Sequence, residues 1–281
     1  METINKITTS KQTTMYDHLC KMIIGNEEVL SRIIKAAVDE ANHLNVEEIR
    51  RLIKGVHIGD LIVNPHFHLV EKKGFIKEEG MVYYDILCYI DVPQEDGKNI
   101  RVYLNVEIQN NPYPGYSIIT RGYAYVSIIV SEQWGSEYDD KNYDGMKKVY
   151  SLWIMPKAPK RKDGHMNVYE TNERIICGTT VEEKEIYDKG VILAIYLNKE
   201  HDLNKKYEEH DELLTPLMVL LNNVLDYKGK QRIIKEYGLN TKKIESEVKD
   251  MCDLGESIVL EARNEGKQIE RKEKNIAHVK K

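Results

Sequence analysis

The sequence has few features of a protein that is stabilised by disulfides, contains structural zinc or is embedded in a membrane. It has no run of about 18 apolar residues, so it predicts no membrane span. The polar N-terminus, METINKITTSKQTT, lacks the apolar core of a signal peptide. Four scattered cysteines form no CxxC pair, which gives no zinc signature and fits a reducing compartment: Cys20, Cys88, Cys177 and Cys252. We therefore expect a cytoplasmic protein without disulfides.

An excess of basic charge is also missing. The 281 residues include 41 Lys and Arg against 46 Asp and Glu, a formal net charge of −5. Many DNA binders are strongly basic, so this balance counts against a passive nucleic-acid coat protein. It counts less against an enzyme whose carboxylates hold metal ions, because local basic patches can coexist with an acidic total.

The hydrophobic pattern predicts three regions. Residues 1–14 look disordered, and residues 15–200 follow the order helix, strands, helix, strand, which indicates an α/β domain. Residues 205–281 are predicted to be helical, with a charged tail. Apolar residues recur in steps of four and three from Ile244 to Ala262, a narrow seam compatible with a coiled coil or with docking on the domain. If this seam pairs two chains, the C-terminal helices would form a homodimer.

Periodicity of 3.6 or 2 residues, together with turn signals, predicts the individual elements. We expect helices over residues 15–44, split at Gly25-Asn26, then 45–54, 116–134, 211–225, 229–237 and from 241 onward. The predicted strands cover residues 81–92, 100–109, 148–155 and 190–197, with an edge strand at 173–177. Residues 55–80 are predicted to be irregular, with short strand-like runs at 60–63 and 67–70.

The two central strands, MVYYDILCYIDV and IRVYLNVEIQ, both place apolar residues at even positions. Their apolar faces coincide only if paired residue numbers add up to an even number, which predicts an odd-length loop or a bulge in the hairpin. A sum near 192 sets Asp85 opposite Glu107. Two carboxylates at that separation repel each other unless a cation lies between them or one stays protonated.

An acid on one strand and Glu-x-Gln on the next can hold a hard divalent cation such as Mg²⁺ or Mn²⁺. In this interpretation Asp85 and Glu107 are ligands, the Ile108 carbonyl is a further ligand and Gln109 orients the attacking water. Such a metal polarises a phosphate and lowers the pKa of its bound water. The alternative is a half-exposed strand that simply shows charged residues to water.

Longer stretches carry a family resemblance. YYDILCYIDV, then NVEIQNNPYPGYSIITRGYAYVSIIVSEQWGSEY and KKVYSLWIMPKAP resemble the PD-(D/E)XK nuclease family transposases, also called recombination-promoting nucleases. The similarity runs from about residue 15 to residue 264. It implies a restriction-endonuclease-like core, a mixed central sheet flanked by helices, with divalent metal and DNA cleavage. By this match Asp85, Glu107 and Gln109 take the D, E and K positions of the motif.

Two residues depart from that pattern. Gln109 occupies the lysine position, and a neutral amide cannot neutralise the charge that develops in the transition state. Asn111 follows in EIQNN, whereas relatives tend to read EAQND. If that acid contributes to catalysis, its loss predicts weaker activity in this chain.

Several other residues are candidates whose structural alternative stays open. Glu40 could supply an extra helix carboxylate or belong to a solvated face, and Asp60 could approach the metal or cap a loop. Arg121 and Tyr125 could contact phosphate, or Arg121 could be a surface residue. A basic loop could bind DNA or be a solvated loop: Lys157, Lys160, Arg161 and Lys162. His66 and His68 share one predicted strand face, but no third ligand has zinc spacing.

Two functions from different classes follow. The first is a Mg²⁺-dependent DNA endonuclease connected with transposition, recombination or DNA-directed defence. The second is a catalytically weak or inactive nuclease scaffold that binds DNA or a protein partner, with the helical C-terminus making the partner contacts. Asp85 and Glu107 on a shared face favour the first, whereas the net acidity and Gln109 favour the second.

Overall fold

The computed structural model describes residues 14–63, 82–95, 97–202, 204–222, 225–239 and 241–254. These residues form two compact units, one of residues 24–218 and one that combines residues 14–23 with residues 219–254. The predicted disordered start at residues 1–13 and the charged tail lie outside the described residues. The domain limits expected from the sequence, near residues 15, 200 and 205, stay predictions.

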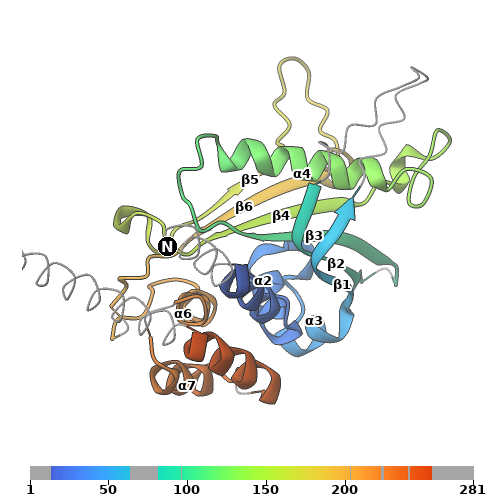
Figure 1. Ribbon diagram of the computed structural model, residues 1–281. Helices are drawn as coiled ribbons and strands as arrows, with labels where there is room; N and C mark the ends of the chain where they lie inside the picture. The colour runs from blue at the N-terminus through green and yellow to red at the C-terminus, as the bar shows by residue number, and fades with distance from the viewer. Residues whose placement is uncertain are drawn as a thin grey trace, which may run out of the picture. The chain divides into compact units, whose positions relative to one another are not determined.

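A mixed six-stranded sheet forms the centre of the larger unit (Figure 1). Its strand order is β1-β2-β3-β4-β6-β5, with β3, β4 and β6 parallel and the other neighbours antiparallel. The α/β class expected from the sequence is thus confirmed. The strand bounds are β1 (Ile53–Val63), β2 (Val82–Pro93), β3 (Asn99–Ile108), β4 (Lys148–Met155), β5 (Met166–Tyr169) and β6 (Gly190–Tyr196).

Helices flank this sheet (Figure 1). Short polar side chains fix their starts: Asn26 accepts from the Glu28 amide, and Asn45 forms a reciprocal capping box with Glu48. The helices of this unit are α2 (Glu27–Ala37), α3 (Val46–Leu52), α4 (Ile118–Glu132), α5 (Lys184–Tyr187) and most of α6 (Asp211–Leu220), with 3₁₀ turns η1 (Asp39–Ala41), η3 (Tyr143–Gly145) and η4 (Lys160–Lys162). The split at Gly25-Asn26 is confirmed, although α2 ends at Ala37.

The β2–β3 hairpin has the predicted register. Pairs run from Ile86 opposite Val106 to Pro93 opposite Asn99, so every pair adds up to 192. The Gln94 amide donates to the Lys98 carbonyl at 2.8 Å, which leaves an odd number of residues in the loop. Apart from half-buried Ile100, the even positions whose burial is described are buried, because the parity brings their apolar side chains to one face.

Two predicted elements are wrong. Residues 55–63 were expected to be irregular, but they belong to β1, whose pairing slips between Lys54 and His57 and again between Ile58 and Leu61. Gly55 and Gly59 stand at these slips with φ of 58° and 65°, so bulges hide the strand period. No strand forms at residues 173–177, where Ile176 is 85% exposed; the edge strand is β5.

Helix α4 packs closely against one face of the sheet. Gly122 of α4 faces Ile192 and Trp153, and a Cβ placed there would lie 2.9 Å from Ile192. Gly190, at the start of β6, similarly leaves room for Val126. The buried cluster beneath α4 includes Tyr84, Tyr125 and Trp153. This packing holds α4 against β4 and β6.

Most described residues of the smaller unit are helical. They comprise residues 14–23, the end of α6 at residues 219–220, α7 (Tyr227–Glu236) and residues 242–254. Ile244, Val248 and Met251 of the predicted seam are buried within the chain, whereas its remaining positions lie outside the described residues. Among the described residues, no helix combines the length and apolarity needed to cross a membrane.

Candidate active site

Backbone amides of the two strands hold the carboxylates of Asp85 and Glu107 at the point where the β2–β3 ladder ends. The last backbone pair is Ile86 with Val106. Beyond it, the Ile108 amide donates to the Asp85 Oδ2 atom at 2.9 Å, and the Asp85 amide donates to the Glu107 Oε1 atom at 3.1 Å. Side-chain oxygens therefore replace the backbone acceptors of the ladder and bring the two carboxylates together at the carboxyl end of β3.

A chain of hydrogen bonds between buried side chains holds the Glu107 carboxylate in place. Asn105 Nδ2 donates to Glu107 Oε1 at 2.8 Å, and Ser151 Oγ donates to Asn105 Oδ1 at 3.0 Å. Trp153 Nε1 in turn donates to Ser151 Oγ at 3.0 Å. Glu107 is 4% exposed, and the other three residues are fully buried. Since β3 and β4 run in parallel, Asn105 lies beside Ser151 and Glu107 beside Trp153, which fixes this chain.

Among the described residues, Arg121 is the cation that acts on the Glu107 carboxyl. Burial, followed by the neighbouring charge of Asp85, raises the pKa of the Glu107 carboxyl well above its ordinary value. The hydrogen bonds from Asn105 and from the Asp85 amide, and the charge of Arg121, oppose that rise only in part. A buried acid beside a second acid is an arrangement that a bound cation would stabilise.

Arg121 lies on α4 at the border of this site. Its Nη1 atom donates to the Tyr116 hydroxyl at 2.9 Å, and its Nη2 atom donates to the Tyr125 hydroxyl. The guanidinium carbon lies 5.1 Å from the centre of the Trp153 ring, within cation–π range. The structure therefore brings the predicted pair Arg121 and Tyr125 next to the Glu107 network.

The residues directly after Glu107 lie at the carboxyl end of β3, beside β4. The Gln109 amide donates to the Ile154 carbonyl at 2.8 Å, which continues the pairing with β4. The Gln109 side-chain amide donates to the Asn111 carbonyl at 2.6 Å. Gln109 is only half-buried, so it lies outside the buried chain that fixes Glu107. The Ile108 backbone contributes its amide to Asp85, as described above.

Glu40 does not join these residues. It lies in η1, where it pairs with Lys148 Nζ at 3.1 Å and accepts from the Tyr150 hydroxyl at 2.8 Å. Lys148 begins β4, and Trp153 beside Glu107 comes five residues later, about 16 Å away at the usual rise of a strand. The structure therefore separates Glu40 from Asp85 and Glu107.

The basic loop leaves the sheet at the same edge as Glu107. It follows the end of β4, and its Ala158 amide donates to the Leu197 carbonyl at 3.0 Å, beyond the end of β6. Lys157, Lys160 and Arg161 are exposed, whereas the Lys162 ammonium lies 4.4 Å from the centre of the Tyr196 ring. The side chain of Asp60 and residues His66 and His68 lie outside the described residues.

The donor set fits a hard divalent cation that keeps water ligands. Among the described residues, no three or more His, Cys, Asp or Glu side chains gather as an all-protein metal cage. Mg²⁺ commonly takes one or two carboxylates, and waters and substrate phosphate complete its octahedron. Asp85 and Glu107 provide two carboxylates whose positions the hydrogen bonds above already fix. These residues would hold the metal.

The sequence pattern does not reveal the residues that support Glu107. Asn105 shares the face of Glu107, but a polar residue in an alternating strand reads as solvent-exposed. Ser151 is the one small polar residue in the apolar run KVYSLWIM. A hydroxyl in a buried strand needs a hydrogen-bond partner, so this residue is the signal in the sequence for a buried polar contact. The pairing that joins the two residues crosses from β3 to β4, and no local pattern encodes it.

No family model, curated protein or solved structure matches the chain.

Proposed function

We propose that this protein is a Mg²⁺- or Mn²⁺-dependent DNA endonuclease of the PD-(D/E)XK type, with a restriction-endonuclease-like core. The observation that carries the proposal is the pair of hydrogen bonds at the end of β3, in which the Asp85 amide donates to the Glu107 carboxylate and the Ile108 amide donates to the Asp85 carboxylate. The neighbouring acids, with the raised pKa of Glu107, destabilise the metal-free fold. Strongly perturbed pKa values of this kind are common at catalytic sites. The resemblance of the hairpin and α4 to recombination-promoting nucleases adds DNA as the substrate.

In this mechanism each residue has a defined task. Asp85, Glu107 and the Ile108 carbonyl would hold the cation. Such a cation would supply polarisation of the scissile phosphate and a lowered pKa of a bound water. Gln109 would hydrogen-bond the attacking water or a phosphate oxygen. Asn105 keeps the Glu107 carboxylate in place, so the geometry is set before substrate binds.

Positive groups border the site on two sides. Arg121 extends from α4 over Trp153, and its position beside Glu107 suits it to contact a phosphate. The loop with Lys157, Lys160, Arg161 and Lys162 leaves the sheet at the same edge and would contact the DNA backbone without reading its sequence. A duplex bound there would cross the carboxyl ends of β3, β4 and β6.

One observation favours the alternative, a weak or inactive scaffold that binds DNA or protein. The side-chain amide of Gln109 donates to the Asn111 carbonyl of its own turn. If this bond persists when DNA is bound, the third motif position contributes neither charge nor a donor to the reaction. Binding would then remain while cleavage is lost.

The test is cleavage of supercoiled plasmid by the purified protein with Mg²⁺ or Mn²⁺. We expect nicking and linearisation by the parent, and a loss of at least about a hundredfold in Asp85→Asn and in Glu107→Gln. Glu95→Gln is the matched control, because Glu95 is an exposed acid in the loop of the same hairpin. Cleavage that survives both site substitutions would assign the activity to another site or to a contaminant. DNA binding without cleavage by the parent would favour the alternative.

A further inference from the structure

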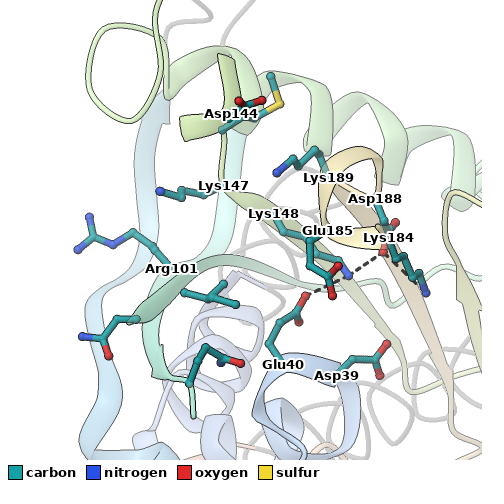
Figure 2. Close-up of a pocket in the computed structure, with 14 residues that line it drawn as sticks. Asp39, Glu40, Arg101, Asp144, Lys147, Lys148, Lys184, Glu185, Asp188 and Lys189 are labelled. Atoms are coloured by element: carbon teal, nitrogen blue, oxygen red, sulfur yellow. Dashed lines mark ion pairs between the residues drawn. The ribbon is translucent and has the colours of Figure 1, made fainter. Parts of the chain in front are cut away.

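A cavity of about 400 Å³ opens at the opposite end of the sheet from Asp85 and Glu107 (Figure 2). Its walls come from η1, the first residues of β3, the residues before β4 and those between α5 and β6. Because β3, β4 and β6 are parallel, their amino ends meet here. The cavity is therefore separate from the proposed active site, although both are built on β3 and β4.

Ion pairs hold one wall of this cavity. The Lys148 ammonium lies 2.7 Å from the Asp188 carboxylate and 3.1 Å from that of Glu40, as the dashed lines in Figure 2 show. Lys184 pairs with Glu170 at 2.7 Å and lies 3.9 Å from Asp188. Asp188 is 1% exposed, so the wall is a fixed network rather than a set of mobile surface charges.

Two further lysines line the cavity without such pairs. Within the described residues, neither Lys147 nor Lys189 forms an ion pair or a side-chain hydrogen bond. The Lys147 backbone is fixed by buried Gln133, whose amide group accepts from the Lys147 N–H at 2.8 Å and donates to its carbonyl at 3.1 Å. Lys189 directly precedes β6, beside the start of β4. In Figure 2 the two lysine side chains point the same way.

Charges of both signs surround Lys189 in the cavity. Burial lowers the pKa of Lys189, the charge of Lys147 lowers it further, and Asp144 and Glu185 act in the opposite direction. An anion bound between Lys147 and Lys189 would offset the repulsion between the two ammonium groups.

We propose that the cavity binds a small phosphate ester, a sugar phosphate or a nucleoside monophosphate, with its phosphate between Lys147 and Lys189. Lysine ammonium groups are common point-charge ligands of phosphate. Asp144 and Glu185 lie within the same lining and accept hydrogen bonds from hydroxyl or amino groups on the rest of the ligand. The volume falls in the range of small-molecule sites.

The test uses the full chain. It measures the midpoint of thermal unfolding with each probe present, and then the affinity for each probe by calorimetry. The probes are inorganic phosphate, a pentose 5-phosphate, a nucleoside 5′-monophosphate and a dicarboxylate. The variants are Lys147→Met and Lys189→Met, which keep the aliphatic stem and remove the charge. Both are expected to fold, because each removal relieves repulsion within the cavity. The control is Lys141→Met, an exposed lysine outside the cavity lining.

We expect at least one ester to raise the midpoint, with an affinity that falls about tenfold or more in Lys147→Met and in Lys189→Met and is unchanged in Lys141→Met. The esterified moiety that binds more tightly identifies the ligand class. Stabilisation that persists in both cavity variants would reflect a general anion effect and would overturn the site. Binding of none of the probes, of the dicarboxylate alone, or of inorganic phosphate without either ester would overturn the proposal.

Discussion

At the carboxyl end of β3, Asp85 and Glu107 lie together with Arg121 as a nearby cation, whereas at the amino end of β4 the buried acid Asp188 is paired with a lysine at 2.7 Å. Both groups of charges are largely buried and both belong to the same sheet. At the amino end a lysine neutralises the buried acid, whereas at the carboxyl end the charge of Asp85 raises the pKa of Glu107 and the charge of Arg121 opposes that rise only in part. This difference indicates that the charges at the amino end stabilise the fold, while the acids at the carboxyl end would be stabilised by a bound cation.

The largest expected effect on stability is at the amino end of β4, where one substitution removes the partner of the buried acid. Lys148→Met leaves Asp188 buried, with Lys184 at 3.9 Å as its remaining cation in the described part of the chain. Removing one partner of a buried pair strands the other charge, so we expect a loss of about 3 kcal/mol in the free energy of unfolding. Urea titration measures this loss.

The double variant Lys148→Met with Asp188→Asn is the control for that loss. It removes both charges, so most of the stability should return, as a double-mutant cycle would show. A loss below about 1 kcal/mol in the single variant would mean that the pair behaves like an exposed ion pair, and the contrast between the two ends would disappear.

The opposite effect is expected at the carboxyl end. The pKa of Glu107 rises from 4.5 to about 8 in the metal-free fold. Between these values the folded state binds more protons than the unfolded state, so the carboxyl destabilises the fold increasingly as pH rises. Glu107→Gln removes this penalty and retains an acceptor for Asn105 and for the Asp85 amide.

We therefore expect Glu107→Gln to stabilise the metal-free protein by about 1–3 kcal/mol at about pH 9 and to have little effect at about pH 5. Urea midpoints measured with a chelator across this range test the expectation. Glu95→Gln, in the exposed hairpin loop, should show no such pH dependence. Equal stability of Glu107→Gln and parent at high pH would mean that the two acids are already compensated within the chain.

How much the sequence alone revealed also differs between the two ends. The Asp85–Glu107 pair was accessible because strand parity is a local property: alternating residues set the faces, and the apolar faces set the sum of 192. The Asn105–Ser151–Trp153 chain was not accessible, since it depends on which strand lies parallel to β3. The bulges at Gly55 and Gly59 hid β1 for a related reason, because they break the period that identifies a strand.

The amino-end cavity was missed because its residues look like ordinary loop charges. Lys147 and Lys148 precede one apolar strand, and Asp188 and Lys189 precede another. Such charges usually flank strands as solvated residues. Only the parallel pairing of β4 with β6 brings the two pairs together, and only η1 adds Glu40. For the same reason Glu40, considered from the sequence as a helix carboxylate for the metal, lies at the other end.

A smaller effect is expected from the residue that supports Glu107. Asn105→Leu removes the 2.8 Å hydrogen bond to Glu107 Oε1, a bond that lowers the Glu107 pKa. The pKa should rise further, and protons should then compete more strongly with the metal. We expect Mg²⁺ affinity to fall about tenfold and the pH at half-maximal cleavage to move upward. Metal titration of cleavage at several pH values measures both.

Tyr103→Phe provides the matched control on the same strand face. It removes the hydrogen bond that Tyr103 donates to Glu137 at 2.7 Å, away from Glu107. Its metal dependence should equal that of the parent. If Asn105→Leu also left the metal dependence unchanged, the Glu107 position would not depend on the polar chain, and the carboxyl end would need another explanation for its order.

The smallest expected effect concerns the third motif position. Gln109 is half-buried and donates to the Asn111 carbonyl outside the buried chain, so Gln109→Lys should change stability by no more than about 0.5 kcal/mol. A lysine there adds a positive charge beside the phosphate in the proposed complex, and we expect cleavage to accelerate severalfold. Gln109→Ala, measured in parallel, should slow cleavage.

Slower cleavage by Gln109→Lys would instead show that the neutral amide positions the water and that a positive charge at this position hinders the reaction. Cleavage unchanged by either substitution would remove Gln109 from the reaction and leave Asp85, Glu107 and the cation to carry it.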